Sequence, residues 1–443
     1  MSRLARKLGA FDATLIVMGG IIGTGIFMNP SVVAARAHTT ALILAVWIFG
    51  GFIALIGAYI FAELAWRRPS VAGSYGYLRD AYHPVLAFMS GWTSLFVTNS
   101  GSFAATAVTF AIYASPFVPY AHNSTTLVAV AVIAVISGVN CFGVGKGVGL
   151  QNVLMLLKIA AIGGLIAAGF FAPHEIAHAQ RLVAPQGLAL IGALGAALLP
   201  VFYSYDGWQT APFMDEELKE PERTLPLGLI WGVAGVVVLY VAVTLVSIRV
   251  LGPDGLAWTP AAATEILRRA VGPAGAALMA GCIALSTIGF LSNTALTIPR
   301  LYFAMAKDRL FFRQIAYVHP KTHAPIVAIL LQAGISIIIV LSGKYDQILN
   351  YVTSMDFLYM ALFAGALFIF RRRAVAGAKQ GIRVPLHPWS TLVFGAVSLA
   401  VVINSYVAFP RDTLIGLAIL LSGAPVYFLW VRRGQPAVAA TRP

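Results

Sequence analysis

The chain has little charge and almost no cysteine. Only 10% of its 443 residues are Asp, Glu, Lys or Arg, whereas 59% are hydrophobic. Soluble domains average about 25% charged residues and cannot bury this much apolar side chain, so the composition excludes a soluble globular protein. The two cysteines, Cys141 and Cys282, lie in apolar segments. They are too few for a disulfide framework or a metal site, and packing is the simpler interpretation of both.

In place of charge, the chain has a series of apolar stretches about twenty residues long, the length that a helix needs to cross roughly 30 Å of hydrocarbon. They predict an all-α polytopic membrane protein, with twelve transmembrane helices in a single transmembrane domain over residues 1–443. The polar breaks are too short for a separate soluble domain. The predicted spans are 11–35, 40–65, 84–115, 125–142, 148–172, 188–214, 226–250, 273–306, 324–342, 347–370, 390–409 and 413–431.

Basic residues outnumber acidic residues by 30 to 16, which gives a formal net charge of +14. Twelve spans place both termini on one side of the membrane, and most of the basic residues then fall in the loops on that side. Cytoplasmic loops carry an excess of Lys and Arg. Both termini are therefore predicted to be cytoplasmic, in a multi-pass protein of the cell membrane. The charge is a topology signal, and nucleic acid is not an expected partner.

Glycine and polar residues interrupt two of the predicted spans near the middle of the bilayer. Span 1 contains the glycine-rich run 19–27, and span 6 contains the run 202–208, which includes Asp206 and Gly207. Irregular backbone at this depth survives where it lines a cavity or binds something. Close packing of helices through small residues is the alternative for the glycines. The two interrupted spans are five apart, the relation expected of two five-helix halves that repeat with inverted topology.

Three stretches resemble one known family. They are the first-span run 20–27, the sixth-span run 205–208 with the acidic, proline-bearing segment 216–226 that follows it, and the run 299–308 with His319, Pro320 and Lys321. In this order they are similar to the amino acid, polyamine and organocation superfamily. Within that superfamily, the chain looks like a bacterial-type member of the L-amino-acid transporter family.

The resemblance implies a five-plus-five inverted repeat with discontinuous helices 1 and 6. The first repeat would be 11–172, the second 188–370, and 390–431 would hold two additional helices. It also implies a secondary active transporter that moves L-amino acids, neutral and small to medium in size, by alternating access and sodium-independent exchange. Eukaryotic members often pair with a glycoprotein through a cysteine in the loop after span 3. The corresponding loop here, 117–125, has no cysteine, so no disulfide-linked heavy-chain partner is expected.

A free amino acid brings a carboxylate and an ammonium into the membrane, and helix ends suit both charges. The half-helix that begins near Thr24 offers N–H groups and a positive dipole end, whereas the half-helix before it offers free carbonyls. By resemblance, Gly23, Thr24 and Gly25 would hold the carboxylate. The carbonyls of Ile21, Tyr203 and Asp206 would receive the ammonium.

Three of these side chains have two interpretations each. The Thr24 hydroxyl either bonds the substrate or caps its half-helix. Tyr203 is either an aromatic gate over the substrate, as in the family, or an ordinary interior tyrosine. The carboxylate of Asp206 either bonds the freed backbone of the broken helix, which is the favoured interpretation, or selects a cationic substrate.

Lys158 lies in the middle of span 5, where a charged residue costs about 2.5 to 3.5 kcal/mol on insertion scales and indicates a functional role. In the family, a lysine in this span stands where sodium-coupled relatives bind a sodium ion. By resemblance, its partners would be the carbonyls of Gly19 and Ile22 and the polar groups of Asn293 and Thr294 on span 8.

Other functions remain as alternatives. A transporter of cationic amino acids or polyamines would use Asp206, and a proton-coupled symporter would use Lys158. A membrane-embedded enzyme would need clustered catalytic or metal ligands, which do not appear within the spans. A channel would need a continuous polar stripe along several spans. No cofactor and no metal are expected, and the expected partners are the amino acid and the lipid bilayer.

Overall fold

The computed structural model describes residues 8–68, 73–114, 117, 125–142, 144–173, 186–259, 261–342, 345–373, 381–408 and 410–432. Within these residues the secondary structure is helical, apart from one isolated bridge between Leu8 and Leu218. The elements in chain order are α1 (Ala10–Ile21), α2 (Gly25–Ala37), α3 (Thr40–Arg67), α4 (Gly73–Ala81), α5 (Pro84–Thr93), the π turn η1 (Ser94–Thr98), α6 (Asn99–Ala114), α7 (Thr125–Cys141), α8 (Val144–Phe171), α9 (Leu188–Tyr205), the 3₁₀ helix η3 (Trp208–Glu217), α10 (Pro221–Ala257), α11 (Ala262–Val271), α12 (Pro273–Thr297), α13 (Pro299–Lys307), the 3₁₀ turn η4 (Arg313–Ala316), α14 (Ile326–Leu341), α15 (Tyr345–Arg372), α16 (Trp389–Ala408) and α17 (Pro410–Arg432).

The helices account for the predicted spans. Among the described residues, seven helical stretches are long and apolar enough to cross a membrane, and the pair α1 and α2 forms one more span with a 46° bend. Four shorter apolar helical stretches, in α7, α9, α14 and α17, fall in the remaining predicted spans. The prediction of an all-α polytopic membrane protein with twelve spans is thus confirmed. The division into repeats 11–172 and 188–370 stays a prediction.

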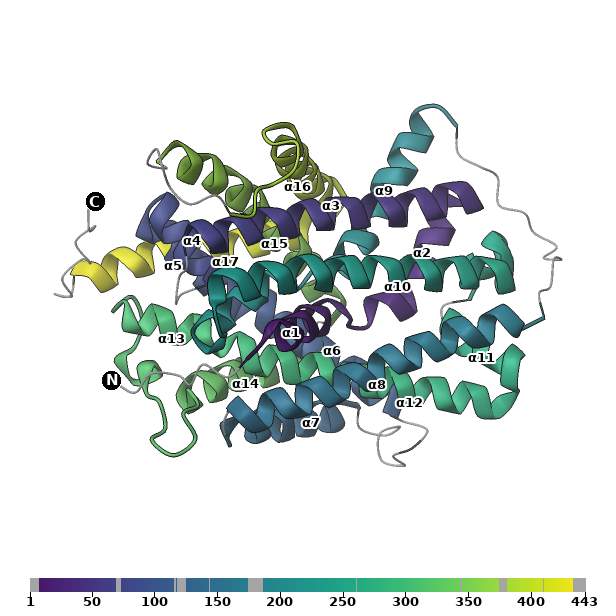
Figure 1. The fold of residues 1–443 in the computed structure, drawn as a ribbon, viewed down its shortest axis with the longest axis horizontal. Coiled ribbons are helices and arrows are strands. Elements are labelled where there is room, and N and C mark those ends of the chain that lie inside the picture. The colour runs from purple at the N-terminus through teal and green to yellow at the C-terminus, as the bar shows by residue number, and fades with distance from the viewer. Residues whose placement is uncertain are drawn as a thin grey trace.

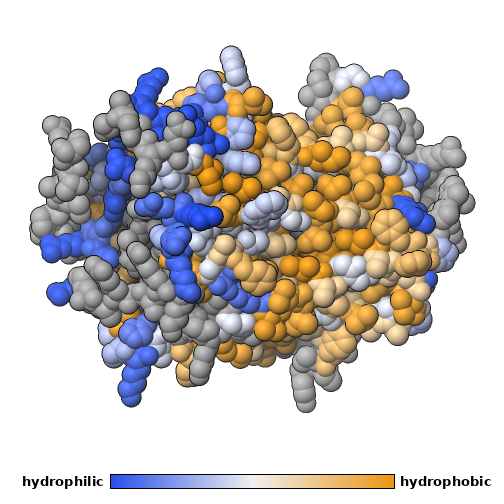
Figure 2. Space-filling view, in the orientation of Figure 1, coloured by the Kyte–Doolittle hydropathy of each residue, from blue (hydrophilic) through white to orange (hydrophobic). Residues whose placement is uncertain are grey.

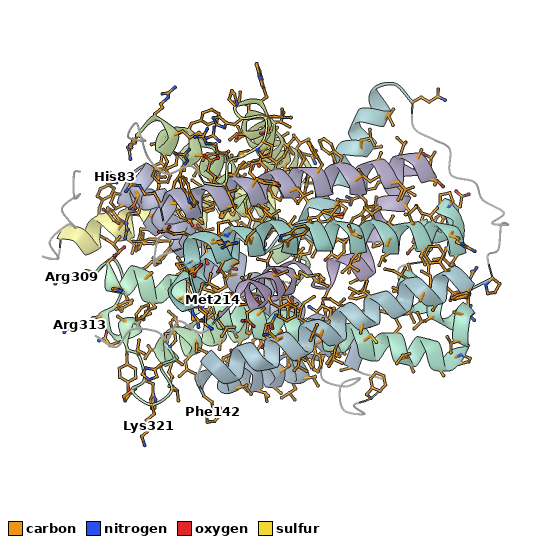
Figure 3. All side chains as sticks on the ribbon, in the orientation of Figure 1. His83, Phe142, Met214, Arg309, Arg313 and Lys321 are labelled. Carbon is orange, nitrogen blue, oxygen red and sulfur yellow. The ribbon has the colours of Figure 1, made fainter. Side chains whose placement is uncertain are left out.

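The long helices run side by side along one direction of the molecule (Figure 1). In the same view, hydrophilic residues gather at the left end and hydrophobic residues cover much of the rest (Figure 2). Many large apolar side chains are exposed, among them Phe52, Trp231 and Val238. Arg309, Arg313 and Lys321 lie toward the left end (Figure 3). The apolar surface fits contact with lipid, and the basic end fits a loop side.

The structure adds details that the spans did not predict. The third span is not a uniform helix, because η1 interrupts it between α5 and α6. The seventh begins earlier than predicted, at Pro221, and its helix is kinked at Gly252, where φ is 69°. Two short helices, α4 and α11, lie in predicted loops. Apolar runs give the length of a span, but they carry little information on local kinks.

One buried ion-pair cluster joins three parts of the chain. The side chain of Glu63 on α3 is fully buried and accepts hydrogen bonds from Arg67 Nε at 2.6 Å and Arg371 Nη2 at 2.5 Å. It also accepts a bond from the backbone N–H of Val384 at 2.7 Å. The cluster therefore fastens α3 to α15 and to the segment before α16.

We expect Glu63→Ala to destabilise the protein by about 3 kcal/mol, because it leaves two arginines and a buried N–H without their partner. Glu265→Ala is the matched control. Arg268 and Arg269 hold the pKa of Glu265 at about 2, but the side chain of Arg268 is 57% exposed, and exposed pairs contribute about 0 to 1 kcal/mol. Thermal denaturation in detergent measures both. Equal shifts in the two variants would contradict the assigned role of Glu63.

Candidate substrate-binding site

The first span is broken where the glycine-rich run predicted it. Helix α1 ends at Ile21 and α2 begins at Gly25. Between them, Ile22 has φ −74° and ψ 88°, outside the helical region, and the N–H of Gly23 donates to the carbonyl of Ile21 at 2.8 Å. The N–H groups at the start of α2 and the last carbonyls of α1 therefore meet in the middle of the span.

The sixth span breaks in a different way. Helix α9 ends at Tyr205, Asp206 is extended with ψ 161°, and Gly207 has φ 114°. The chain then continues as the 3₁₀ helix η3 from Trp208. Because an L side chain is strained at a φ of 114°, glycine is required at position 207 on conformational grounds alone.

The two breaks touch each other. A Cβ atom on Gly207 would lie 2.1 Å from the carbonyl oxygen of Gly20, so the backbones are in direct contact. A Cβ on Gly25 would lie 3.0 Å from the Cα of Ser204, which brings α2 equally close to α9. The side chain of Asn29 donates to Ser204 Oγ at 2.7 Å and thereby fixes the same pair of helices. Small residues on both spans permit this approach.

A cavity of about 610 Å³, part of it open to solvent, lies at the meeting point of the breaks. Every residue that was predicted to bind the substrate lines it, and so do Asn293 and Thr294, whereas Gly19, Ile22 and Lys158 lie outside its lining. The residues that line it are Gly20, Ile21, Gly23, Thr24, Gly25, Asn99, Ser102, Thr106, Tyr203, Ser204, Asp206, Gly207, Gln209, Phe290, Asn293, Thr294 and Asp356.

The backbone groups at the cavity can bind both charges of an amino acid. The first turn of α2 presents N–H groups that have no partner within the helix. The Thr24 hydroxyl makes no capping bond to this helix, which is contrary to the capping interpretation. The carbonyl of Ile21 already accepts bonds from the N–H of Gly23 and, at 3.2 Å, from the hydroxyl of Tyr240. An ammonium at this carbonyl would have to displace one of them.

Lys158 contacts the first break from the side. Its side chain is buried, and Nζ donates a hydrogen bond to the carbonyl of Ile22. The side chain passes over Gly289 of α12, where a Cβ would lie 3.3 Å from its Cε. Among the other predicted partners, Asn293 has a buried amide without a hydrogen-bond partner among the described residues. The structure thus brings Lys158 to Ile22 but does not bond it to Asn293.

A second unpaired amide lies near Asn293. Gln151 on α8 is fully buried and, like Asn293, makes no side-chain hydrogen bond within the described part of the chain. A Cβ on Gly19 would lie 2.1 Å from Gln151 Nε2 and 3.5 Å from Asn293 Oδ1. Gly19 is thus the residue that lets α8 and α12 approach α1. Sequence reasoning identified Gly19 and Asn293 but missed Gln151.

Asp206 lies in the second break, and a second acid lines the same cavity. The N–H of Gly207 in this break donates to Gln209 Oε1 at 2.9 Å. Asp206 lines the cavity together with Asp356 of α15. Asp356 was not predicted as a site residue. The available signal was its place near the middle of the tenth span, where a carboxyl group is costly.

Comparison with known proteins agrees with this geometry. The family model of the amino acid permeases matches residues 8–424, nearly the whole chain. The chain belongs to the amino acid permease family. Relatives of this permease include the serine/threonine exchanger SteT of Bacillus subtilis, 26% identical over 96% of this chain and 97% of its own length. The b(0,+)-type amino acid transporter 1 of Mus musculus is 29% identical over 97% of this chain and 88% of its own length.

A third relative is the large neutral amino acids transporter small subunit 2 of Homo sapiens, 28% identical over 97% of this chain and 81% of its own length. The permease is therefore a multi-pass transporter and not an enzyme. In the described part of the chain, no three His, Cys, Asp or Glu side chains come together as metal ligands. The alternative of a membrane-embedded enzyme is set aside.

Gly207→Ala tests the contact between the breaks. The new methyl group cannot fit against the carbonyl of Gly20 at a φ of 114° without moving one span relative to the other. We expect substrate binding to weaken by about tenfold or more, since such strain costs about 1 to 3 kcal/mol. Gly138→Ala on α7 is the control, because its Cβ would meet nothing within 4 Å. Titration calorimetry with both variants measures the effect, and equal affinities would contradict it.

Proposed function

We propose that this permease exchanges neutral L-amino acids of small to medium size across the cell membrane, by alternating access and without sodium. The cavity supports this proposal because it lies where two interrupted spans meet, with N–H groups at one helix start and carbonyls at two helix ends. Such a site suits a carboxylate and an ammonium on adjacent atoms. We further propose that both termini are cytoplasmic.

Two relatives support exchange and neutral substrates by their names. SteT is a serine/threonine exchanger, and the human relative is a large neutral amino acids transporter subunit. The geometry of the site also gives a reason why the inward movement of one substrate should be coupled to the outward movement of another. The site is divided between two spans that touch through backbone at Gly20 and Gly207, so a bound substrate bridges both halves of it. A transporter that changes conformation more easily with this bridge in place exchanges one substrate for another.

Cationic amino acids or polyamines form the second candidate substrate class. Asp206 and Asp356 both line the cavity, so the site holds two carboxyl groups. The position of Asp206 at the end of α9, beside Gly207 in the break, supports the structural interpretation instead. Proton coupling through Lys158 stays a further alternative.

We propose that the permease functions without a disulfide-linked heavy chain. The loop 117–125, which would carry the cysteine of such a link, lies outside the described residues except for Phe117 and Thr125. Cys141 and Cys282 are free thiols in the structure. Neither is in that loop.

Exchange is tested with purified protein in liposomes. We expect labelled L-serine or L-alanine to enter several times faster when unlabelled amino acid is loaded inside, because the loaded carrier returns more readily than the empty one. Protein-free liposomes give the background. If empty and loaded liposomes fill at the same rate, the exchange proposal is wrong while amino acid transport stands. No uptake of any amino acid would refute the proposed substrate class as well.

The bond between Lys158 and Ile22 predicts that sodium is not required. An ammonium that is already solvated by this carbonyl leaves no need for a metal ion there. We expect equal exchange rates in sodium and choline buffers. Lys158→Ala should slow turnover by about tenfold or more with a smaller change in affinity, because the lysine lies outside the cavity lining. Strong stimulation by sodium, or normal turnover of the alanine variant, would contradict this role.

A further inference from the structure

Arginines from different segments of the chain meet around one carboxylate. Glu63, near the end of α3, accepts hydrogen bonds from the side chains of Arg67 and Arg371 and from the N–H of Val384. Arginine keeps its charge in proteins, so one carboxylate can neutralise only one of these two guanidinium groups. The end of α3, the end of α15 and the segment before α16 therefore meet at a point with surplus positive charge.

Three further arginines lie beside this point. Arg68 follows α3 directly, and its guanidinium carbon lies 5.7 Å from the centre of the Phe370 ring on α15. Arg372 is the last residue of α15, and Arg383 precedes the N–H group that bonds Glu63. All three arginines are exposed, and none makes a hydrogen bond or an ion pair within the described part of the chain. Arg68, Arg372 and Arg383 are called the basic cluster below.

The basic cluster lies at the hydrophilic end of the molecule. Nη1 of the neighbouring Arg373 donates to the carbonyl of Asp80 at 2.7 Å. Asp80 belongs to α4, which lies at the left end in Figure 1, where Figure 2 shows hydrophilic residues. An excess of Lys and Arg on one side sets the topology, but it does not require arginines from three segments to converge on one point. Their convergence therefore needs an explanation of its own.

An exposed apolar surface begins next to the basic cluster. Leu386 and Trp389, which follow Arg383 in the chain, have exposed fractions of 80% and 73%. Tryptophan is enriched where lipid headgroups meet hydrocarbon. Exposed apolar side chains continue along α16 at Leu392, Val393, Leu399, Ile403 and Val407. Charge, an interfacial ring and an apolar track thus follow one another in the order of headgroup, glycerol and acyl chains in a phospholipid.

The segment that carries Arg383 is held by packing on two sides. A Cβ on Gly381 would lie 2.0 Å from the ring of Trp66 on α3. The ring of His387 lies 4.7 Å, between centroids, from that of Phe368 on α15. With the bond from its backbone to Glu63, these contacts fix the segment against α3 and α15. The basic cluster is therefore positioned by the fold before a ligand arrives.

We propose that the basic cluster and the exposed face of α16 form a binding site for one anionic phospholipid of the surrounding membrane. The phosphate accepts hydrogen bonds from the guanidinium groups, whose planar forks match phosphate oxygens. The acyl chains lie along the exposed apolar side chains of α16, and the ring of Trp389 lies at the level of the glycerol. A zwitterionic lipid fits less well, because its headgroup brings a cation of its own beside the arginines.

The test is thermal denaturation of the full-length protein in an uncharged detergent, with phosphatidylglycerol or phosphatidylcholine added in increasing amounts. A lipid that binds the folded state raises the denaturation temperature. We expect phosphatidylglycerol to stabilise the native protein at much lower concentration than phosphatidylcholine. Combining Arg68→Gln, Arg372→Gln and Arg383→Gln should raise the half-maximal phosphatidylglycerol concentration by about a hundredfold, since each basic residue near an anionic lipid contributes about a factor of five.

The matched control combines Arg309→Gln, Arg313→Gln and Lys321→Gln. It removes three exposed positive charges toward the same end of the molecule, outside the basic cluster (Figure 3). The control should keep the native response to phosphatidylglycerol. Glycerol phosphate, which has the anionic group without acyl chains, should stabilise none of the proteins at the same concentrations.

Three results would overturn the proposal. The first is a native protein that responds equally to the two lipids. The second is an equal loss of response in the two triple variants, which would show a diffuse effect of charge and no site. The third is stabilisation by glycerol phosphate as strong as that by the lipid, which would show a phosphate site without acyl chains.

A second pair of variants covers the case in which the triple variant of the basic cluster fails to fold, as size-exclusion chromatography would show. Trp389→Ala should weaken the response to phosphatidylglycerol several-fold, because the ring then no longer covers the glycerol region. Trp231→Ala on α10 is the control, since Trp231 has a similar exposed fraction of 66% and lies away from the basic cluster in the chain. An equal response of the two alanine variants would contradict the proposed site.

Discussion

The close backbone contact between Gly207 and Gly20 is the constraint on which the site depends. It brings the end of α9 against the end of α1, where both helices leave carbonyl groups without helical partners. In a hydrocarbon environment such groups must be satisfied by protein, water or a ligand. The start of α2 adds N–H groups of opposite polarity at the same place. A cavity with both polarities of backbone dipole follows from the absence of a Cβ atom at Gly207.

The buried charges of the transporter act on the same two breaks. Lys158 donates to the carbonyl of Ile22 in the first break. Asp206 lies at the second break, and Asp356 of α15 lines the same cavity. Charged groups are expensive at this depth, so they are tolerated where a hydrogen bond or a polar cavity offsets their burial. Spans 5 and 10 thereby meet the interrupted spans.

The sequence predicted much of this because membrane constraints are strong. Apolar length located the twelve spans, and glycine with polar residues located both breaks. That Asp206 and Asp356 line one cavity could not be predicted, since it depends on how α9 and α15 face each other, which a hydropathy pattern does not contain. The same holds for Gln151 beside Gly19 and for Tyr240 on the Ile21 carbonyl. In each case tertiary packing decided which polar groups meet.

The most direct test of the account is a structure of the protein with an amino acid bound at the cavity. The account predicts the substrate carboxylate within hydrogen-bond distance of the N–H groups of residues 23–25 and the ammonium against the carbonyls of Ile21, Tyr203 or Asp206. It also predicts that the backbone contact between Gly20 and Gly207 stays in place beneath the substrate. A substrate bound elsewhere, or held in this cavity by side chains alone with the helix ends unused, would contradict the central claim.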